Sequence, residues 1–248
     1  METWVIVFAV AGILLSALGI ILRVVNRGWR RDKAELFLSV ALFAIMWYAF
    51  IYMMILTGYV VHIPNFYNKG IPLYYLIAPS MYFYVRIKTQ QRYRQPRYWY
   101  LHLLPFVFGL IDIVPYALAS AVEKQELMGR LVTNMRMGFE HGYGFIDQQW
   151  HYVIRLSLAF VYLLAQWRLL FMAELEEVSK SLLVSLYALT IIYSLFIAVQ
   201  VSMILNILFN RVQASYILKD AHQLIWVSGL YLLFSLWVCF GARFWRAN

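Results

Sequence analysis

Seven long apolar runs, separated by short polar connections, set the strongest limit on what this chain can fold into. As an α-helix rising 1.5 Å per residue, each run is long enough to cross about 30 Å of hydrocarbon. The pattern predicts an all-α membrane protein, a seven-transmembrane helix bundle that forms one domain over residues 1–248. The predicted spans are approximately residues 3–22, 35–58, 70–87, 99–119, 150–171, 181–207 and 223–244.

The composition excludes a water-soluble domain. Hydrophobic residues make up 63% of the chain and charged residues 13%, whereas soluble domains hold about 45–50% apolar and about 25% charged residues. The net charge of +9 does not indicate a nucleic-acid site, because the cations gather in the short connections between apolar runs. We therefore expect membrane lipids to be partners of much of the surface.

Lysine and arginine residues in the connections predict the orientation of the chain. The first and third connections hold five each, the second holds one and the fourth holds three. The five in the third connection are Arg86, Lys88, Arg92, Arg94 and Arg97. Because cytoplasmic loops carry an excess of Lys and Arg, we predict the N-terminus outside and the C-terminus in the cytoplasm.

Two further features shape the predicted bundle. Pro79 in the third span and Pro115 in the fourth each remove a backbone donor, so we expect a structural kink at both. The only sizeable connection covers residues 120–149, and its first half has the pattern of a short amphipathic helix on the outer surface. Gly138, Gly142 and Gly144 then interrupt regular structure.

Ionisable residues inside hydrocarbon are energetically unfavourable and therefore mark candidate sites. Asp112 and Arg155 lie inside the fourth and fifth spans, each on the order of 10 Å below the outer surface in this topology. Their opposite charges and matching depth favour an ion pair, which either locks two helices or coordinates a ligand. Alternatively, Arg155 extends toward the outer headgroups.

Other polar and aromatic residues fall at a similar depth and complete a candidate pocket. The same residues also suit simple hydrogen bonding between helices, and the sequence leaves both interpretations open. The candidate ligand-binding residues are Tyr74, Tyr75, Asp112, His151, Arg155, Gln200 and Trp226.

The sequence offers no pattern for catalysis or metal binding. The five histidines show no H-E-x-x-H spacing, and no nucleophile–base set or phosphate-binding loop is present. We expect no enzymatic activity, no catalytic residue, no metal site and no cofactor. The single cysteine, Cys239, excludes an intrachain disulfide.

One stretch carries a family resemblance. Residues 72–86 read PLYYLIAPSMYFYVR, and residues 102–106 read HLLPF after a short basic connection. This pattern resembles the membrane region of bacterial AraC-type transcription regulators, with Ala78 at the position of the family's glycine. The resemblance is best over residues 70–120 and implies a multi-pass protein of the bacterial inner membrane. It further implies a receptor domain that detects an extracytoplasmic or lipid-soluble signal and passes it to a cytoplasmic DNA-binding output.

In those regulators a helix-turn-helix domain follows the last span, whereas this sequence ends at Asn248. The chain is therefore expected to be either a truncated sensor or a stand-alone relative, and to contact DNA only through a C-terminal domain outside it. The expected ligand is an unknown small molecule or lipid, and a homodimer is expected by analogy. The alternative function is a small-solute transporter or channel, although no internal repeat of the kind usual in transporters is visible.

Overall fold

Every regular element in the described part of the chain is helical. The computed structural model describes residues 2–27, 32–90, 96–134, 138, 142–173, 178–209 and 221–241. The elements are α1 (Glu2–Arg27), α2 (Lys33–Leu56), η1 (Tyr59–His62), η2 (Pro64–Phe66), η3 (Asn68–Gly70), α3 (Ile71–Tyr75), α4 (Ile77–Thr89), η4 (Trp99–Leu103), α5 (Leu104–Asp112), α6 (Val114–Leu118), α7 (Ala121–Thr133), α9 (Gln148–Phe171), α10 (Lys180–Phe209), α12 (Ala221–Leu236) and the π-helical η5 (Trp237–Gly241).

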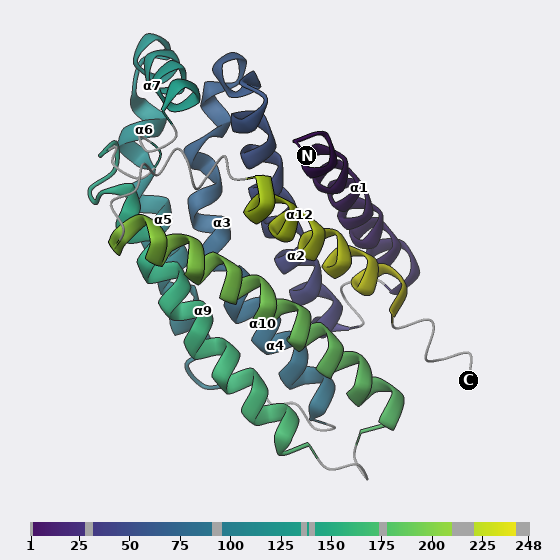
Figure 1. Cartoon of the computed structure of the whole chain (residues 1–248). Coiled ribbons are helices and arrows are strands. Elements are labelled where there is room, and N and C mark those ends of the chain that lie inside the picture. The colour runs from purple at the N-terminus through teal and green to yellow at the C-terminus, as the bar shows by residue number, and fades with distance from the viewer. Residues whose placement is uncertain are drawn as a thin grey trace.

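Six helices form a closed ring. Helix α1 packs against α2 and α12, α2 packs against α4, α4 against α9, α9 against α10, and α10 against α12 (Figure 1). Helix α5 lies outside this ring and packs on α3. The ring encloses an apolar core in which Leu42, Met81, Val85 and Leu186 are at most 1% exposed.

The outer surface of the ring is apolar as well. Leu14, Phe160 and Val161, from α1 and α9, are all more than half exposed, which in a water-soluble protein would be an aggregation hazard. Five helical stretches of the described residues are long and apolar enough to cross a membrane: Thr3–Val25, Lys33–Leu56, Trp99–Leu118, Gln148–Phe171 and Lys180–Leu205. The apolar helix Leu224–Phe240 is shorter. The prediction of an all-α membrane bundle is confirmed at this level.

The predicted third span, residues 70–87, is not one helix. Helix α3 ends at Tyr75, Leu76 forms a turn, and α4 begins at Ile77. The cause is Pro79, whose missing N–H leaves the carbonyl of Tyr75 without its helical partner. The kink predicted at Pro79 is thus confirmed, and the two short helices fall outside the stretches long enough to span.

The fourth predicted span, residues 99–119, is also segmented. It consists of η4, α5 and α6, with a turn at Ile113 between the last two. Pro115 lies at the first turn of α6, where a missing N–H is tolerated. The kink predicted at this proline is confirmed as a break between two helices.

The remaining spans differ from the prediction mainly at their ends. Helix α1 continues five residues beyond residue 22. The last predicted span, residues 223–244, corresponds to α12 and η5, and its final three residues lie outside the described part. Arg92 and Arg94 of the third connection lie outside it too.

Helix α7 lies above α6 at one end of the bundle and packs on η1, η2 and α2; we call this end the α7 end (Figure 1). Its start is fixed by a capping box in which Ser120 and Glu123 bond each other's backbone. Its apolar face, Leu127, Met128 and Leu131, packs with Val60 and Tyr116 in a second core. The amphipathic helix predicted in residues 120–149 is therefore confirmed.

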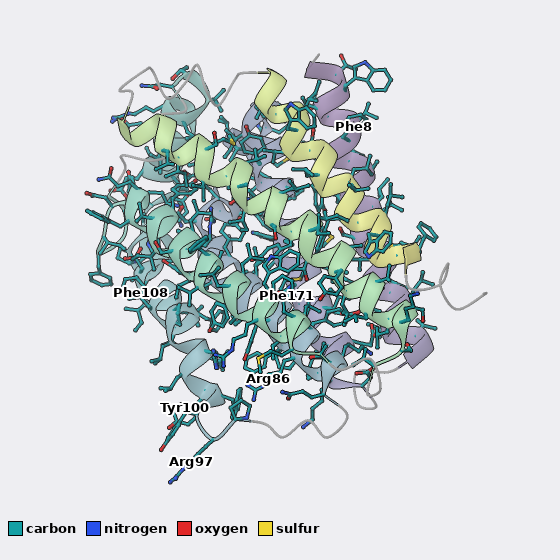
Figure 2. The ribbon with its side chains drawn as sticks, turned by 60° about the horizontal axis from the view of Figure 1, so that its bottom comes forward. Phe8, Arg86, Arg97, Tyr100, Phe108 and Phe171 are labelled. Carbon is teal, nitrogen blue, oxygen red and sulfur yellow. The ribbon has the colours of Figure 1, made fainter. Side chains whose placement is uncertain are left out.

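The opposite end, which we call the basic end, holds the last turns of α1 and α4, the first turn of α2, and η5 (Figure 1). Figure 2 shows Arg86, Arg97 and Tyr100 together there, far from Phe8. The exposed ring of Tyr100 suits the headgroup layer of a membrane. Arg23, Lys33, Arg86 and Lys88, described cations of the two connections richest in Lys and Arg, thus lie at one end.

Buried charges tie the basic end together. Glu35 on α2 is 5% exposed and pairs with Arg23 of α1 at 3.0 Å and Lys88 of α4 at 3.2 Å. Lys88 also contacts Asp32 at 2.7 Å, and Arg23 donates to the carbonyl of Val238 in η5 at 2.5 Å. The sequence analysis missed this network because its members stand at span ends.

We expect Glu35→Gln to destabilise the fold by about 3–5 kcal/mol, because it leaves two partly buried cations without their shared carboxylate. The free energy of unfolding in mixed micelles measures this. The matched control is Glu126→Gln, which removes an exposed pair with Arg130 and should change the free energy by at most about 0.5 kcal/mol. Equal effects of the two variants would contradict the account of the network.

Asp32 provides a pH-dependent test of the same network. Partial burial opposes ionisation of Asp32, but the hydrogen bond and charge of Lys88 outweigh it and hold the pKa below its ordinary value. The stabilisation is therefore present above about pH 3.9 and is lost as the pH falls through the lowered pKa. Asp32→Asn retains the α2 cap and should destabilise the fold at pH 7 but not at low pH, as measured by thermal unfolding.

Candidate ligand-binding site

A cavity of about 110 Å³ lies inside the ring at the α7 end. Helices α2, α3, α9, α10 and α12 form its walls, and Leu131 of α7 contributes from above. At about 10–15 Å³ for each water position, this is space for several small-molecule atoms.

Arg155 of α9 is the cation of this cavity. Its guanidinium carbon lies 5.1 Å from the ring centre of Tyr48, 5.3 Å from that of Tyr74 and 4.9 Å from that of Tyr152. Tyr48 meets Tyr74 edge-on at 5.0 Å, so rings from α2, α3 and α9 surround the charge. Contacts of this kind are each worth about 0.5–1 kcal/mol at exposed sites and about 2 kcal/mol when desolvated, so they offset part of the cost of placing a cation among these helices.

Asp112 does not pair with Arg155, so the ion pair expected from their matching depth is wrong. The carboxylate accepts a hydrogen bond from Nε2 of His151 at 2.7 Å and from the backbone N–H groups of Phe145 at 2.8 Å and Ile146 at 3.1 Å. These donors satisfy Asp112 where it stands, at 3% exposed. The structure therefore separates the two ionisable residues into two sites.

Hydrogen bonds of Asp112, His151 and Tyr75 hold several elements together, and we call these three residues the clamp. The imidazole of His151 bridges two residues, with Nε2 at 2.7 Å from Oδ2 of Asp112 and Nδ1 at 2.8 Å from the hydroxyl of Tyr75. The chain Tyr75–His151–Asp112 thus joins α3, α9, α5 and the segment that precedes α9. Gly144 completes the fit, because an added Cβ would stand 2.0 Å from Oδ2 of Asp112.

Polar groups other than Arg155 also reach the cavity system. A second cavity of about 30 Å³ adjoins the first, and Arg155, Gln200, Tyr74 and Tyr48 line both. Tyr75 and Tyr193 line the second cavity. The hydroxyl of Tyr193 is buried, with no hydrogen-bond partner in the described part of the chain.

Of the seven predicted residues, the structure brings Tyr74, Arg155 and Gln200 together around the first cavity, and Tyr75 lies at the second. Asp112 and His151 belong to the neighbouring clamp. Trp226 does not line this cavity. Its side chain is 66% exposed on the outside of α12, while Leu224 and Val227 of the same helix line the cavity.

Several polar residues that line the cavities are not among those expected from the sequence. One of them, Tyr152, could have been found, because it lies three positions before Arg155 and so on the same helix face. Gln148 also lies on α9, seven positions before Arg155. The other four come from α2, α10 and the segment before α3, and no sequence pattern joins those to α9. The missed residues are Tyr48, Tyr52, Asn68, Gln148, Tyr152 and Tyr193.

Toward the basic end, the helices around the cavity close against each other. Gln166 of α9 donates to Thr190 of α10 at 2.6 Å, and Trp167 donates to Ser194 at 3.1 Å. These bonds hold helices together, which is the interpretation that the sequence left open for intramembrane polar residues. The cavity therefore ends within the bundle.

Comparison of the chain with protein-family models, with curated proteins and with solved structures finds no match.

Loss of the clamp should cost stability without affecting the cavity directly. We expect Gly144→Ala to displace the Asp112 carboxylate and to destabilise the fold by about 1–3 kcal/mol. Asp112→Ala should cost more, because it removes three hydrogen bonds to the carboxylate, and hydrogen bonds to charged groups contribute about 1.5–3 kcal/mol each. Thermal unfolding in detergent measures both.

Gly129→Ala is the control for these variants. No atom lies within 4 Å of the added Cβ, and alanine favours the α7 helix by about 0.5–1 kcal/mol. Stability should stay unchanged or rise. A Gly144→Ala variant as stable as the Gly129→Ala variant would refute the clamp.

Proposed function

We propose that this chain is the sensor domain of a signal receptor in the bacterial inner membrane, with its N-terminus outside and its C-terminus in the cytoplasm. The observation that carries the proposal is the cavity around Arg155, which is walled by five helices and lies at the end opposite the basic loops. In the proposed topology this end faces the extracytoplasmic side. The bundle then passes the membrane seven times, with α3 and α4 together forming the third passage.

Helix α12 provides a route from the cavity to the other end. Leu224 and Val227 stand in the cavity wall, and the same helix continues to η5 at the basic end. Between the two ends, the hydroxyl of Ser16 in α1 contacts those of Tyr231 at 3.1 Å and Ser235 at 2.9 Å on α12. A ligand that favours one position of α12 would shift the population of states at the cytoplasmic side.

The resemblance of residues 72–86 and 102–106 to AraC-type regulators supports a transcriptional output for such a shift. In this proposal the signal leaves through the cytoplasmic end of the last helix, and DNA is contacted only by a further C-terminal domain. Homodimer formation is part of the proposal, because DNA regulators commonly bind as dimers.

A transporter or channel fits the same fold less well. Transport requires a polar path through the membrane, whereas the described core below the cavity is built from Leu42, Met81, Val85 and Leu186. Sensing requires only the cavity and a connected helix, so we favour it.

In the test, an enlarged side chain occupies the space that a ligand would fill. Met203→Trp should fill part of the cavity, because Met203 lines it, and should move α12. The readout is the maleimide reaction of Cys239, the only cysteine of the chain, which is 8% exposed at the basic end. We expect its rate to change about fivefold, the lower range of allosteric couplings.

Leu205→Trp is the matched control, since this residue is 47% exposed on the outer face of the same helix, and should leave the rate unchanged. A Cys239→Ser variant verifies that labelling is specific. If Met203→Trp and Leu205→Trp both react at the unmodified rate, the two ends are uncoupled and the sensor function is wrong.

A further inference from the structure

Arg155 is a cation without a counter-ion in the described part of the chain. It is the one charged side chain among the described residues lining the first two cavities. No carboxylate of the described residues lies within ion-pair distance of it, and its described contacts are the three tyrosine rings. Rings attract a cation but do not neutralise it. The positive field of Arg155 therefore acts on whatever occupies the cavity.

Two uncharged groups at the cavities are also available for hydrogen bonding. The amide of Gln200, which lines both cavities with Arg155, has no hydrogen-bond partner in the described part of the chain. The hydroxyl of Tyr193, in a side chain only 2% exposed, likewise has none there. Buried polar groups are nearly always hydrogen-bonded. Donors left open beside an open cation indicate a place for an acceptor with negative charge.

A third cavity extends this site into an apolar region. It measures about 40 Å³, lies between α1, α2, α10 and α12, and shares Tyr48, Tyr52, Leu224 and Val227 with the first cavity. Its other walls are almost entirely hydrocarbon, from residues such as Val5, Ile45 and Phe196. The first cavity, which contains the charge of Arg155, and the apolar third cavity therefore adjoin at Tyr48.

We propose that the cavities bind a monoanionic amphiphile, whose carboxylate or phosphodiester lies on Arg155 and Gln200 and whose apolar chain passes Tyr48 into the third cavity. The planar guanidinium fork matches the oxygens of either head group. A head group with two negative charges would exceed the single cation, and a cationic one would be repelled. The claim that the amphiphile acts as a signal rests on the proposed sensor function. The claim that the cavities bind it does not, because binding requires no output.

The binding experiment uses the full chain in phosphatidylcholine nanodiscs and follows the thermal midpoint against ligand concentration. The probes are dodecanoate, 1-dodecanol, dodecyltrimethylammonium and acetate. We expect dodecanoate to raise the midpoint saturably. Dodecanol and acetate should bind at least about tenfold more weakly, because dodecanol lacks the negative charge and acetate lacks the long apolar chain. The ammonium probe should give no saturable rise.

The matched variants are Arg155→Gln and Arg168→Gln, which remove one charge each from the same helix, the second at an exposed position. Arg155→Gln should weaken dodecanoate binding about tenfold or more, while Arg168→Gln should bind it as the unmodified chain does. Arg155→Lys should recover part of the affinity, because it restores the charge without the fork. If Arg155→Gln does not fold, Gln200→Ala and the four probes on the unmodified chain carry the test.

Lysophosphatidylglycerol, a phosphodiester with one chain, forms a parallel arm that distinguishes a lipid head group from a free carboxylic acid. Saturable, Arg155-dependent binding of either anion supports the inference. It is overturned if dodecanol matches dodecanoate, or if Arg155→Gln binds both anions as well as Arg168→Gln does.

Cys239 labelling in the same nanodiscs separates the two proposals. Arg155-dependent binding without a change in the labelling rate would sustain the ligand class and count against the sensor function. A change in the labelling rate caused by Met203→Trp, without preferential binding of the anions, would support the sensor function and count against the ligand class.

Discussion

The contact of the Arg155 guanidinium with three tyrosine rings is the interaction on which the α7 end of the bundle depends. The rings belong to α2, α3 and α9, so the same contact that holds the cation also holds three helices around an open space. An acid in their place would have neutralised the charge and closed the site. Because Asp112 is already satisfied by His151 and two backbone donors, the charge of Arg155 remains available.

Much of the fold could be predicted from the sequence, because apolar length alone marks helices that face lipid. Helices α2, α9 and α10 begin and end within three residues of the predicted spans. The third predicted span consists of two short helices, α3 and α4. Hydropathy gives only its length, whereas Pro79, which removes the N–H that the carbonyl of Tyr75 would bond, predicts the kink. The network around Glu35 was missed because a charge at a span end is read as exposed until the neighbouring helices are placed.

For each residue of the candidate site, the sequence predicts the depth in the membrane but not the direction in which the residue faces from its helix. Counting along a span gives the height of a residue in the membrane, and Tyr74, Arg155 and Gln200 were found that way. Helix rotation decides which residue of a turn faces inward, at about 100° per residue. Trp226 was therefore chosen where Leu224 and Val227 line the wall, and Asp112 was assigned the wrong partner.

The most direct test of whether Arg155 binds an anionic amphiphile is native mass spectrometry of the protein released from nanodiscs that contain both anionic and neutral lipids. The account predicts one tightly retained molecule per chain, with a single negative charge and an apolar tail, which is lost from Arg155→Gln and kept by Arg168→Gln. Retention of a neutral lipid to the same extent in all three proteins would contradict it.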